Sequence, residues 1–324
     1  MGGIVYSAFT ATGLIILGSY SLVAAIYAYL QASSISNGSE SRYTAKPYHP
    51  FPAAHSSADP GSRKGAWWNV RQRGGLYLIV AWLMVAILHE ILSAADFDPL
   101  VKGHTAVHRF TALQSSAVLL LFLVLAISLI FLPILDVRLF FALFSVAFLL
   151  HSTTSSSAAS LQTSDLQGHL SSVSSRVSAV TSLISLALAV NPNLFQFEVG
   201  LWASVLLQGF WNLQTGLSLY VDAFIPDGCH RLLDVPAGID GSTKCELEDS
   251  RLRAFAILDF MFVLYVIIAI VIVATIYAVL AKAVCATAGG PRSRAGSYEA
   301  LPTSESGSTM IDSIQMKTLA GTQA

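Results

Sequence analysis

The chain has 324 residues, of which 54% are hydrophobic and only 11% are charged, and its formal net charge is −1. An ordinary soluble domain carries about 25% charged residues, so this composition excludes a water-soluble protein of the usual kind, which needs a charged surface. The near-zero net charge gives no sign of nucleic-acid binding, and we expect no nucleic-acid partner. We therefore predict an all-α integral membrane protein that is surrounded by the lipid bilayer.

Seven stretches of the chain are apolar enough to cross a bilayer, whose hydrocarbon core needs roughly 20 apolar residues per helix. The fifth is the least apolar, because it is rich in serine and carries Arg176, and the fourth fades into serine and threonine after His151. We predict a seven-helix transmembrane bundle over residues 1–285. A count of six, in which the fourth and fifth stretches form a broken pair, is the alternative. The stretches are residues 4–30, 76–95, 110–132, 139–160, 170–190, 199–224 and 254–281.

Lysine and arginine are unevenly distributed between the two sides of this bundle. The polar loop after the first stretch, the third loop and the segment beyond the last stretch hold most of the 18. Because cytoplasmic loops are enriched in these residues, we predict an N-terminus that is outside or lumenal and a C-terminus in the cytosol. This orientation corresponds to a protein of the secretory pathway or the plasma membrane.

Residues 286–324 are rich in Gly, Ser and Thr and have no apolar periodicity, so we predict a disordered cytosolic tail. Within it, Tyr298 and Leu301 have the spacing of a tyrosine-based sorting signal, which would bind the sorting machinery. Such four-residue patterns also arise by chance. On the other side of the membrane, Cys229 and Cys245 share the sixth loop, where oxidising conditions permit a disulfide. Two free thiols are the alternative.

Ionisable side chains gather toward the outer end of the predicted bundle. Imidazole is the commonest metal ligand, and nearby carboxylates can orient it or complete the shell. The more common explanation is that each group satisfies a partner between helices, and no tight metal motif such as His-Glu-x-x-His is present. We expect no cofactor, and a transition metal at the histidine cluster is the alternative. The residues are His89, Glu90, His104, His108, His151, His169 and Asp259.

The sixth stretch carries polar side chains at positions i, i+3, i+4 and i+7, a spacing that places them on one face of a helix. These side chains form a polar stripe, which serves more often to hold helices together than to line a conduction path. On another face, Gly209 and Gly216 permit close approach of a neighbouring helix. The small residues of the serine-rich runs 152–160 and 171–178 are likewise suited to close packing. The stripe consists of Gln208, Trp211, Asn212 and Thr215.

Several of these features resemble the transmembrane protein 45 family, seven-pass eukaryotic membrane proteins that share a domain of unknown function. The resemblance is specific over residues 206–277 and looser over 3–190. The family's third and fourth helices are dense in histidine, whereas Gln114 stands here where a histidine is usual. If the family's cluster binds metal, the resemblance implies that this chain has lost ligands. The motifs that carry the resemblance are Gln208-Gly209-Phe210-Trp211, Gly216, Pro226-Asp227-Gly228-Cys229, Cys245, Arg251-Leu252-Arg253-Ala254 and Lys46-Pro47-Tyr48-His49-Pro50.

Three functions compete. The leading hypothesis is a non-enzymatic multi-pass protein that acts through partner, lipid or trafficking interactions, because no nucleotide-binding fingerprint or zinc-ligand spacing is visible and we identify no catalytic residue. The second is an intramembrane metal-dependent enzyme that acts on lipids, with His104, His108, His151 and His169 as ligands beside Glu90 or Asp259. The third is a transporter or proton-coupled carrier that uses the polar stripe, although we find no internal repeat of the kind that supports a carrier fold.

Overall fold

The computed structural model describes residues 2–35, 43–49, 63–95, 106–131, 136–161, 164–231 and 243–288. The chain divides into two units, Met1–Cys285 and Ala286–Ala324. Tyr298, Leu301 and His104 lie outside the described residues, as does the side chain of His108. The predictions that depend on them remain predictions.

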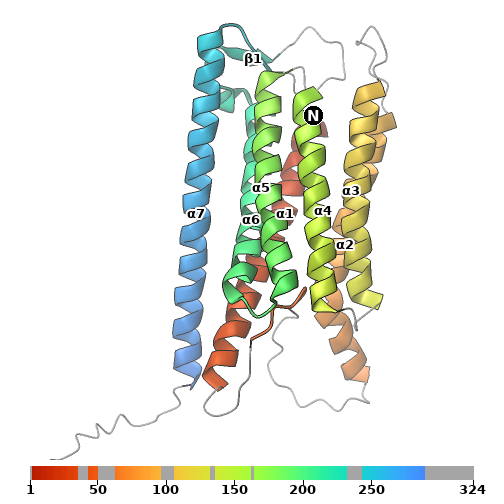
Figure 1. Cartoon of the computed structure of the whole chain (residues 1–324), viewed down its shortest axis with the longest axis vertical. Helices are drawn as coiled ribbons and strands as arrows, with labels where there is room; N and C mark the ends of the chain where they lie inside the picture. The colour runs from red at the N-terminus through yellow and green to blue at the C-terminus, as the bar shows by residue number, and fades with distance from the viewer. Residues whose placement is uncertain are drawn as a thin grey trace, which may run out of the picture. The chain divides into compact units, whose positions relative to one another are not determined.

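The described part of the chain contains seven long helices and one short hairpin (Figure 1). The two strands of the hairpin are antiparallel and pair Cys229 with Cys245. The N-terminus and the hairpin lie at the same end of the bundle (Figure 1), which we call the N-terminal end. The elements are α1 (Gly2–Ile35), α2 (Arg63–Ala95), α3 (Ala106–Phe131), α4 (Val137–Leu161), α5 (Asp165–Val190), α6 (Phe195–Tyr220), the 3-10 turn η1 (Asp222–Phe224), β1 (Cys229–Arg231), β2 (Thr243–Cys245) and α7 (Glu248–Ala288).

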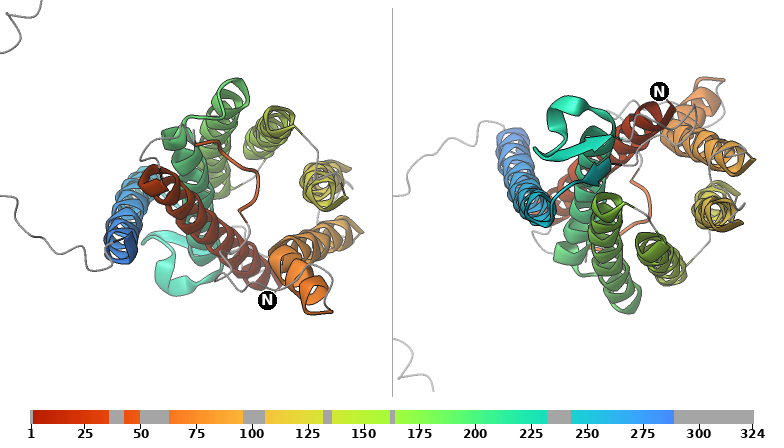
Figure 2. Two further views of the ribbon diagram at one scale, coloured as in Figure 1. Left: turned by 90° about the horizontal axis from the view of Figure 1, so that it is seen from below. Right: turned by 90° about the horizontal axis from the view of Figure 1, so that it is seen from above.

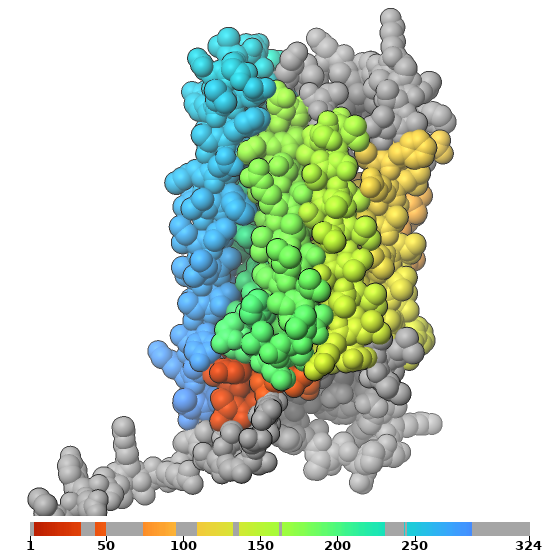
Figure 3. Space-filling model, in the orientation of Figure 1, coloured from red at the N-terminus to blue at the C-terminus, as the bar shows by residue number. Residues whose placement is uncertain are grey.

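Six of these helices, α1 to α5 and α7, are long and apolar enough to cross a membrane. Large apolar side chains on their outer faces are exposed, among them Leu78, Phe131 and Ile270. Lipid tails are the medium in which such faces are stable, because they are as apolar as the side chains themselves. Figure 3 shows α7 running along the edge of the bundle, and only a small part of its apolar stretch is buried. The chain is therefore a multi-pass membrane protein.

Helix α6 is not among these six, although its 26 residues equal the length of α5. Its polar residues Glu198, Gln208, Asn212 and Gln214 are spread along the helix, so that no long continuous stretch of it is apolar enough. The helix can hold these groups because many of its residues are buried inside the protein rather than turned toward lipid. It begins before the predicted stretch 199–224 and ends at Tyr220, after which the chain makes the 3-10 turn.

The predicted bounds of the apolar stretches differ from the helix bounds for a simple reason. Apolarity ends where a helix leaves the hydrocarbon, but its backbone hydrogen bonds continue. Thus α1 extends to Ile35 rather than 30, α2 begins at Arg63 rather than 76, and α7 covers Glu248–Ala288 rather than 254–281.

Glycines allow α1 and α6 to cross closely, as predicted for Gly209 and Gly216. A Cβ atom added to Gly209 would lie 2.9 Å from the backbone nitrogen of Ile15, and one added to Gly216 would lie 2.7 Å from Cβ of Ser7. On the α1 side, a Cβ at Gly18 would lie 2.9 Å from the backbone nitrogen of Leu206. Helices α1 and α6 thus form a tightly packed pair.

Serines hold α4 and α5 together. The Ser145 hydroxyl donates to the backbone carbonyl of Ser182, the Ser182 hydroxyl donates to that of Ser145, and both distances are 2.9 Å. Further along, the Ser175 hydroxyl donates to the Ser152 carbonyl, also over 2.9 Å. The serine-rich stretches are therefore a packing surface, as their small side chains predict.

Viewed along the axis of the bundle, α2, α3, α4 and α5 follow one another around one side, while α1 crosses from α2 toward α6 on the other (Figure 2). The segment 43–49 lies within this ring of helices at the end opposite the N-terminus (Figures 1 and 2). Its backbone is fixed by the Ala45 N–H, which donates to the carbonyl of Pro192 over 2.8 Å. Ala45 itself is fully buried in an apolar cluster with Leu188 and Leu201.

Candidate functional site

A cavity of about 370 Å³ lies between α1, α2, α3, α4, α6 and segment 43–49. Its volume falls within the range of about 300–1,000 Å³ that is typical of small-molecule sites. Along α1 its lining runs from Tyr6 to Ser21, a distance of about 22 Å at the helical rise of 1.5 Å per residue. The cavity is therefore long and lies parallel to the helices.

One half of this cavity is apolar and aromatic. The ring centroids of Phe144 and Phe148 lie 4.9 Å apart, and those of Phe122 and Phe148 lie 5.1 Å apart, in edge-to-face arrangements. Leu125 and Leu129 of α3 continue the same surface. Pro47 and Tyr48 line the cavity as well, from segment 43–49. This half suits a hydrocarbon chain rather than a polar ligand.

The other half is lined by polar groups from α1, α2, α4 and α6. One of them is Gln208, whose amide nitrogen lies 3.1 Å from the hydroxyls of Ser174 and Ser178 and 3.3 Å from Nε2 of His151. Gln208 is buried, and its hydrogen-bonding capacity is used within the protein. It is a structural residue that also fixes His151 at the cavity wall.

Asn212, one turn further along α6, also lines the cavity. Its side-chain amide makes no hydrogen bond to any of the described residues, although an amide in an apolar interior needs partners for both its N–H groups and its oxygen. Trp202 lines the cavity as well, and its indole N–H is buried with no acceptor among the described residues. These two side chains have hydrogen-bonding capacity that an occupant can use.

Tyr6 and Glu90 line the polar half nearest the N-terminus. The Tyr6 hydroxyl is hydrogen-bonded to the Glu90 carboxyl group. The ring of His89 stacks on that of Tyr6, with centroids 3.7 Å apart, and its buried Nδ1 has no partner among the described residues. His89 thus supports Tyr6 and is not itself among the lining residues.

The predicted stripe is shared between two surfaces. Gln208, Asn212 and Thr215 line the cavity, whereas Trp211 is fully buried on the neighbouring face of α6. Its indole N–H donates to the Leu170 carbonyl over 3.0 Å, and its ring packs edge-to-face on Phe262. Trp211 therefore joins α6 to α5 and α7.

His169 and Asp259 form a separate pair between α5 and α7. Nε2 of His169 lies 2.9 Å from Oδ1 of Asp259, and the imidazole stacks on Phe255 with centroids 4.5 Å apart. The Asp259 side chain is 60% exposed. A surface pocket beside this pair is lined by His169, Phe255, Asp165 and Arg251.

The predicted ionisable cluster is thus distributed over different places. His89 lies against Tyr6, His151 against Gln208 and His169 against Asp259. Within the part of the chain that the structure describes, no three His, Cys, Asp or Glu side chains lie close enough together to hold a metal ion.

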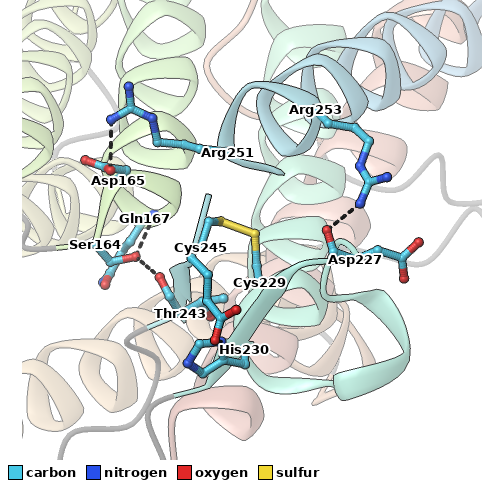
Figure 4. The surroundings of a disulfide bond; sticks show 11 residues. Ser164, Asp165, Gln167, Asp227, Cys229, His230, Thr243, Cys245, Arg251 and Arg253 are labelled. Atoms are coloured by element: carbon cyan, nitrogen blue, oxygen red, sulfur yellow. Dashed lines mark hydrogen bonds and ion pairs between the residues drawn. A yellow bond between two sulfur atoms is a disulfide. The ribbon is translucent and has the colours of Figure 1, made fainter. Parts of the chain in front are cut away.

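The predicted disulfide is present: Cys229 and Cys245 are bonded (Figure 4). The bond joins the two strands of the hairpin. Around it, the Ser164 hydroxyl donates to the Thr243 carbonyl over 2.7 Å, and the Arg253 guanidinium donates to the Asp227 carbonyl over 2.6 Å (Figure 4). These contacts tie the hairpin to the first turns of α5 and α7.

A buried ionisable pair at the other end of the bundle was not among the predicted site residues. Nε2 of His49 lies 2.8 Å from Oε1 of Glu198, and the Tyr43 hydroxyl donates to the second oxygen of that carboxylate. Glu198 is fully buried and His49 is 8% exposed. Burial raises the pKa of Tyr43 above its usual value near 10, and the Glu198 carboxylate raises it further, so the phenol remains a donor. The sequence did offer one signal for this pair: Glu198 stands directly before the predicted apolar stretch 199–224, where a charged side chain needs a partner.

A model of a family of unknown function, DUF716, matches residues 137–278 of this chain. The matched part includes α4, α5, α6, the disulfide hairpin and most of α7. It therefore contributes one wall of the cavity, and α1, α2 and α3 contribute the other from outside the match. No curated protein matches the chain.

Proposed function

We propose that the protein is a non-enzymatic multi-pass membrane protein that binds a lipid-like amphiphile in the cavity between α1, α2, α3, α4 and α6. The observation that carries this proposal is the division of one cavity into an end lined by amide, hydroxyl and carboxyl groups and an end lined by phenylalanine and leucine. An amphiphile has the same division, with a polar head group on an apolar chain.

The length of the cavity supports the same kind of occupant. Its lining extends about 22 Å along α1, which exceeds the roughly 15 Å that one lipid leaflet contributes to the hydrocarbon core. An extended acyl chain can therefore lie in the aromatic half while its head group reaches Asn212. A compact polar solute would leave the aromatic half empty.

The partners of the described histidines favour binding over metal-dependent chemistry on a lipid. His151 is hydrogen-bonded to Gln208 and His169 to Asp259, so each has a protein partner that explains its presence. Segment 43–49 packs against α6 next to the aromatic half, and this favours an enclosed binding site over a conduction path.

We propose further that α6 is a seventh membrane span. In this arrangement the N-terminus and the disulfide hairpin are outside or lumenal, while segment 43–49 and the C-terminus are cytosolic. The excess of Lys and Arg on the second side supports this orientation. The resemblance to the transmembrane protein 45 family, whose members are seven-pass proteins, supports the same arrangement. Tyr298 and Leu301 in a cytosolic tail would then recruit sorting machinery.

A photoreactive long-chain lipid with a clickable tag tests the binding proposal in membranes. Ser115→Phe introduces a large ring from the cavity wall, while Gln114→Phe introduces the same ring at the exposed neighbouring position of α3. We expect adducts on α4 and α6 in the wild type and in Gln114→Phe, and few or none in Ser115→Phe. Equal labelling of all three proteins, or adducts confined to outward-facing residues of α7, contradicts the proposal.

A further inference from the structure

We infer that the amphiphile in this cavity carries a hydroxyl or carbonyl oxygen within its chain, about 15 Å from its head group. This inference rests on the proposed function and specifies the ligand of the same site. It follows from two hydrogen-bond donors in the aromatic half of the cavity, the indole N–H of Trp202 and the hydroxyl of Ser21. A plain hydrocarbon chain offers neither of them an acceptor.

Both donors are buried, and neither has a hydrogen-bond partner among the described residues. Trp202 is 6% exposed and Ser21 is 7% exposed, and the Trp202 indole nitrogen has no acceptor. The Ser21 hydroxyl does not make the bond to the preceding turn that Thr10 makes in the same helix. Tyr48, which also lines the aromatic half, is by contrast hydrogen-bonded to Tyr20. A buried donor without an acceptor is unfavourable, so two of them on one cavity wall indicate an acceptor on the occupant.

Trp202 and Ser21 lie at the same level of the bundle, on the two helices that cross closely. At the crossing, a Cβ atom on Gly18 of α1 would lie 2.9 Å from the backbone nitrogen of Leu206 of α6. The two helices run in opposite directions, because positions later in α6 meet positions earlier in α1. Ser21 lies three residues after Gly18 and Trp202 four residues before Leu206. Both are therefore about 5–6 Å from the crossing in the same direction, and one oxygen with two lone pairs can accept from both.

The distance of these donors from the polar half places the acceptor in the chain rather than in the head group. Trp202 belongs to a buried apolar cluster with Phe148 and with Leu22, the residue after Ser21. Asn212, where the head group is placed, lies ten residues further along α6 than Trp202. Ten residues of helix span about 15 Å. An ester or amide oxygen directly beside the head group is therefore too far away, and the oxygen that meets Trp202 belongs to an oxygenated chain.

Three monoacylglycerols with chains of equal length test the inference. One has a plain chain, one carries a ketone next to the head group, and one carries the ketone about 15 Å away in the extended chain. A ketone only accepts hydrogen bonds, so it reports donation by the protein. Each probe competes with a photoreactive plain-chain monoacylglycerol for the full-length protein in nanodiscs, with empty nanodiscs as the blank. We expect the distal ketone to bind about tenfold more tightly than the plain chain, and the proximal ketone to bind no more tightly than the plain chain.

Two variants remove one donor each. Trp202→Phe keeps an aromatic ring but lacks the N–H, and Ser21→Ala lacks the hydroxyl. In either variant the preference for the distal ketone should fall to about threefold or less. Ser204→Ala is the control and should keep the full preference, because the Ser204 hydroxyl is also buried but donates to the Leu201 carbonyl and does not line the cavity. Photolabelling of each variant by the plain-chain probe shows that the variant is folded, and either variant alone tests the inference.

The outcomes separate this inference from the proposed function. If none of the three probes competes in the wild type, the binding proposal is wrong and this inference falls with it. If the probes compete but the distal ketone binds no more tightly than the plain chain, the cavity binds amphiphiles and only the oxygen in the chain is overturned. A preference for the distal ketone that survives in both Trp202→Phe and Ser21→Ala would overturn the role given to these two donors.

Discussion

Glu198 is a carboxylate with no access to solvent, held by Tyr43 and His49 of a segment distant in sequence. Removing one partner from a buried pair leaves the other without compensation, which costs about 3–5 kcal/mol. We therefore expect Glu198→Ala to lower the free energy of unfolding by about that amount, and the loss can be measured by thermal unfolding in detergent.

The matched control for this change is Glu246→Ala. Glu246 also faces a histidine, His230, but the two side chains are 73% and 51% exposed and lie 3.8 Å apart. Exposed pairs contribute about 0–1 kcal/mol, so this variant should unfold close to the wild type. Equal losses in the two variants would show that burial of Glu198 contributes nothing.

Asn212 and Gln208 are one turn apart on α6, and the structure predicts opposite effects for their replacement. Gln208→Leu removes the side-chain partner of Ser174 and His151 and one of the two partners of Ser178, which should cost about 1–3 kcal/mol. Asn212→Leu removes an amide that has no described partner, so we expect stability to be equal or higher while lipid labelling falls. Unfolding of the lipid-free protein measures the first effect and adduct yield the second. A destabilised Asn212→Leu that retains full labelling would make Asn212 a packing residue.

At the scale of helices, the approach of α1 to α6 depends on the absence of side chains at Gly18 and Gly209. In each case an added Cβ would lie 2.9 Å from a backbone nitrogen, which cannot rotate away as a side chain can. Overpacking of this kind costs about 1–3 kcal/mol. We expect Gly18→Ala and Gly209→Ala to unfold at lower temperature than the wild type.

Gly200 of α6 is the control for these changes, because the nearest atom to an added Cβ is Cδ1 of Ile184 at 3.8 Å, an ordinary contact. Alanine is also a better helix former than glycine, by up to about 1 kcal/mol. Gly200→Ala should therefore be neutral or slightly stabilising. If all three variants behave alike, close approach at the crossing is not what these glycines provide.

The helices themselves were predictable because apolar length is a property of the sequence alone, and so were the glycine and serine packing faces and the disulfide. Contacts between segments that are distant in the sequence could not be predicted. His49 reads as part of a polar loop, and nothing in residues 43–49 reveals that the segment returns to Glu198. Some predicted contacts are also absent. His89 and His169 were expected to lie together because their positions along the helices place them at a similar depth in the membrane, but they have separate partners, Tyr6 and Asp259.

At the scale of the whole molecule, the number of spans decides on which side of the membrane every loop lies. Helices α1 to α5 and α7 alone would give an even number of crossings and would leave both ends of the chain on one side. With α6 the number is odd. Burial between other helices would allow α6 to cross, as we propose, because it keeps Glu198, Gln208 and Gln214 away from lipid.

Two engineered thiols test whether α6 crosses the membrane. They are introduced into a protein in which the exposed Cys285 is replaced by alanine. Asn193→Cys lies just before α6 and Phe224→Cys just after it, and both positions are exposed. With a membrane-impermeant maleimide, we expect Phe224→Cys to react only from outside or the lumen and Asn193→Cys only from the cytosol. Cys285 in the wild-type protein should react on the same side as Asn193→Cys, because α7 runs antiparallel to α6 (Figure 1). Reaction of both engineered thiols from one side would mean that α6 does not cross, since a crossing helix must separate the residues at its two ends.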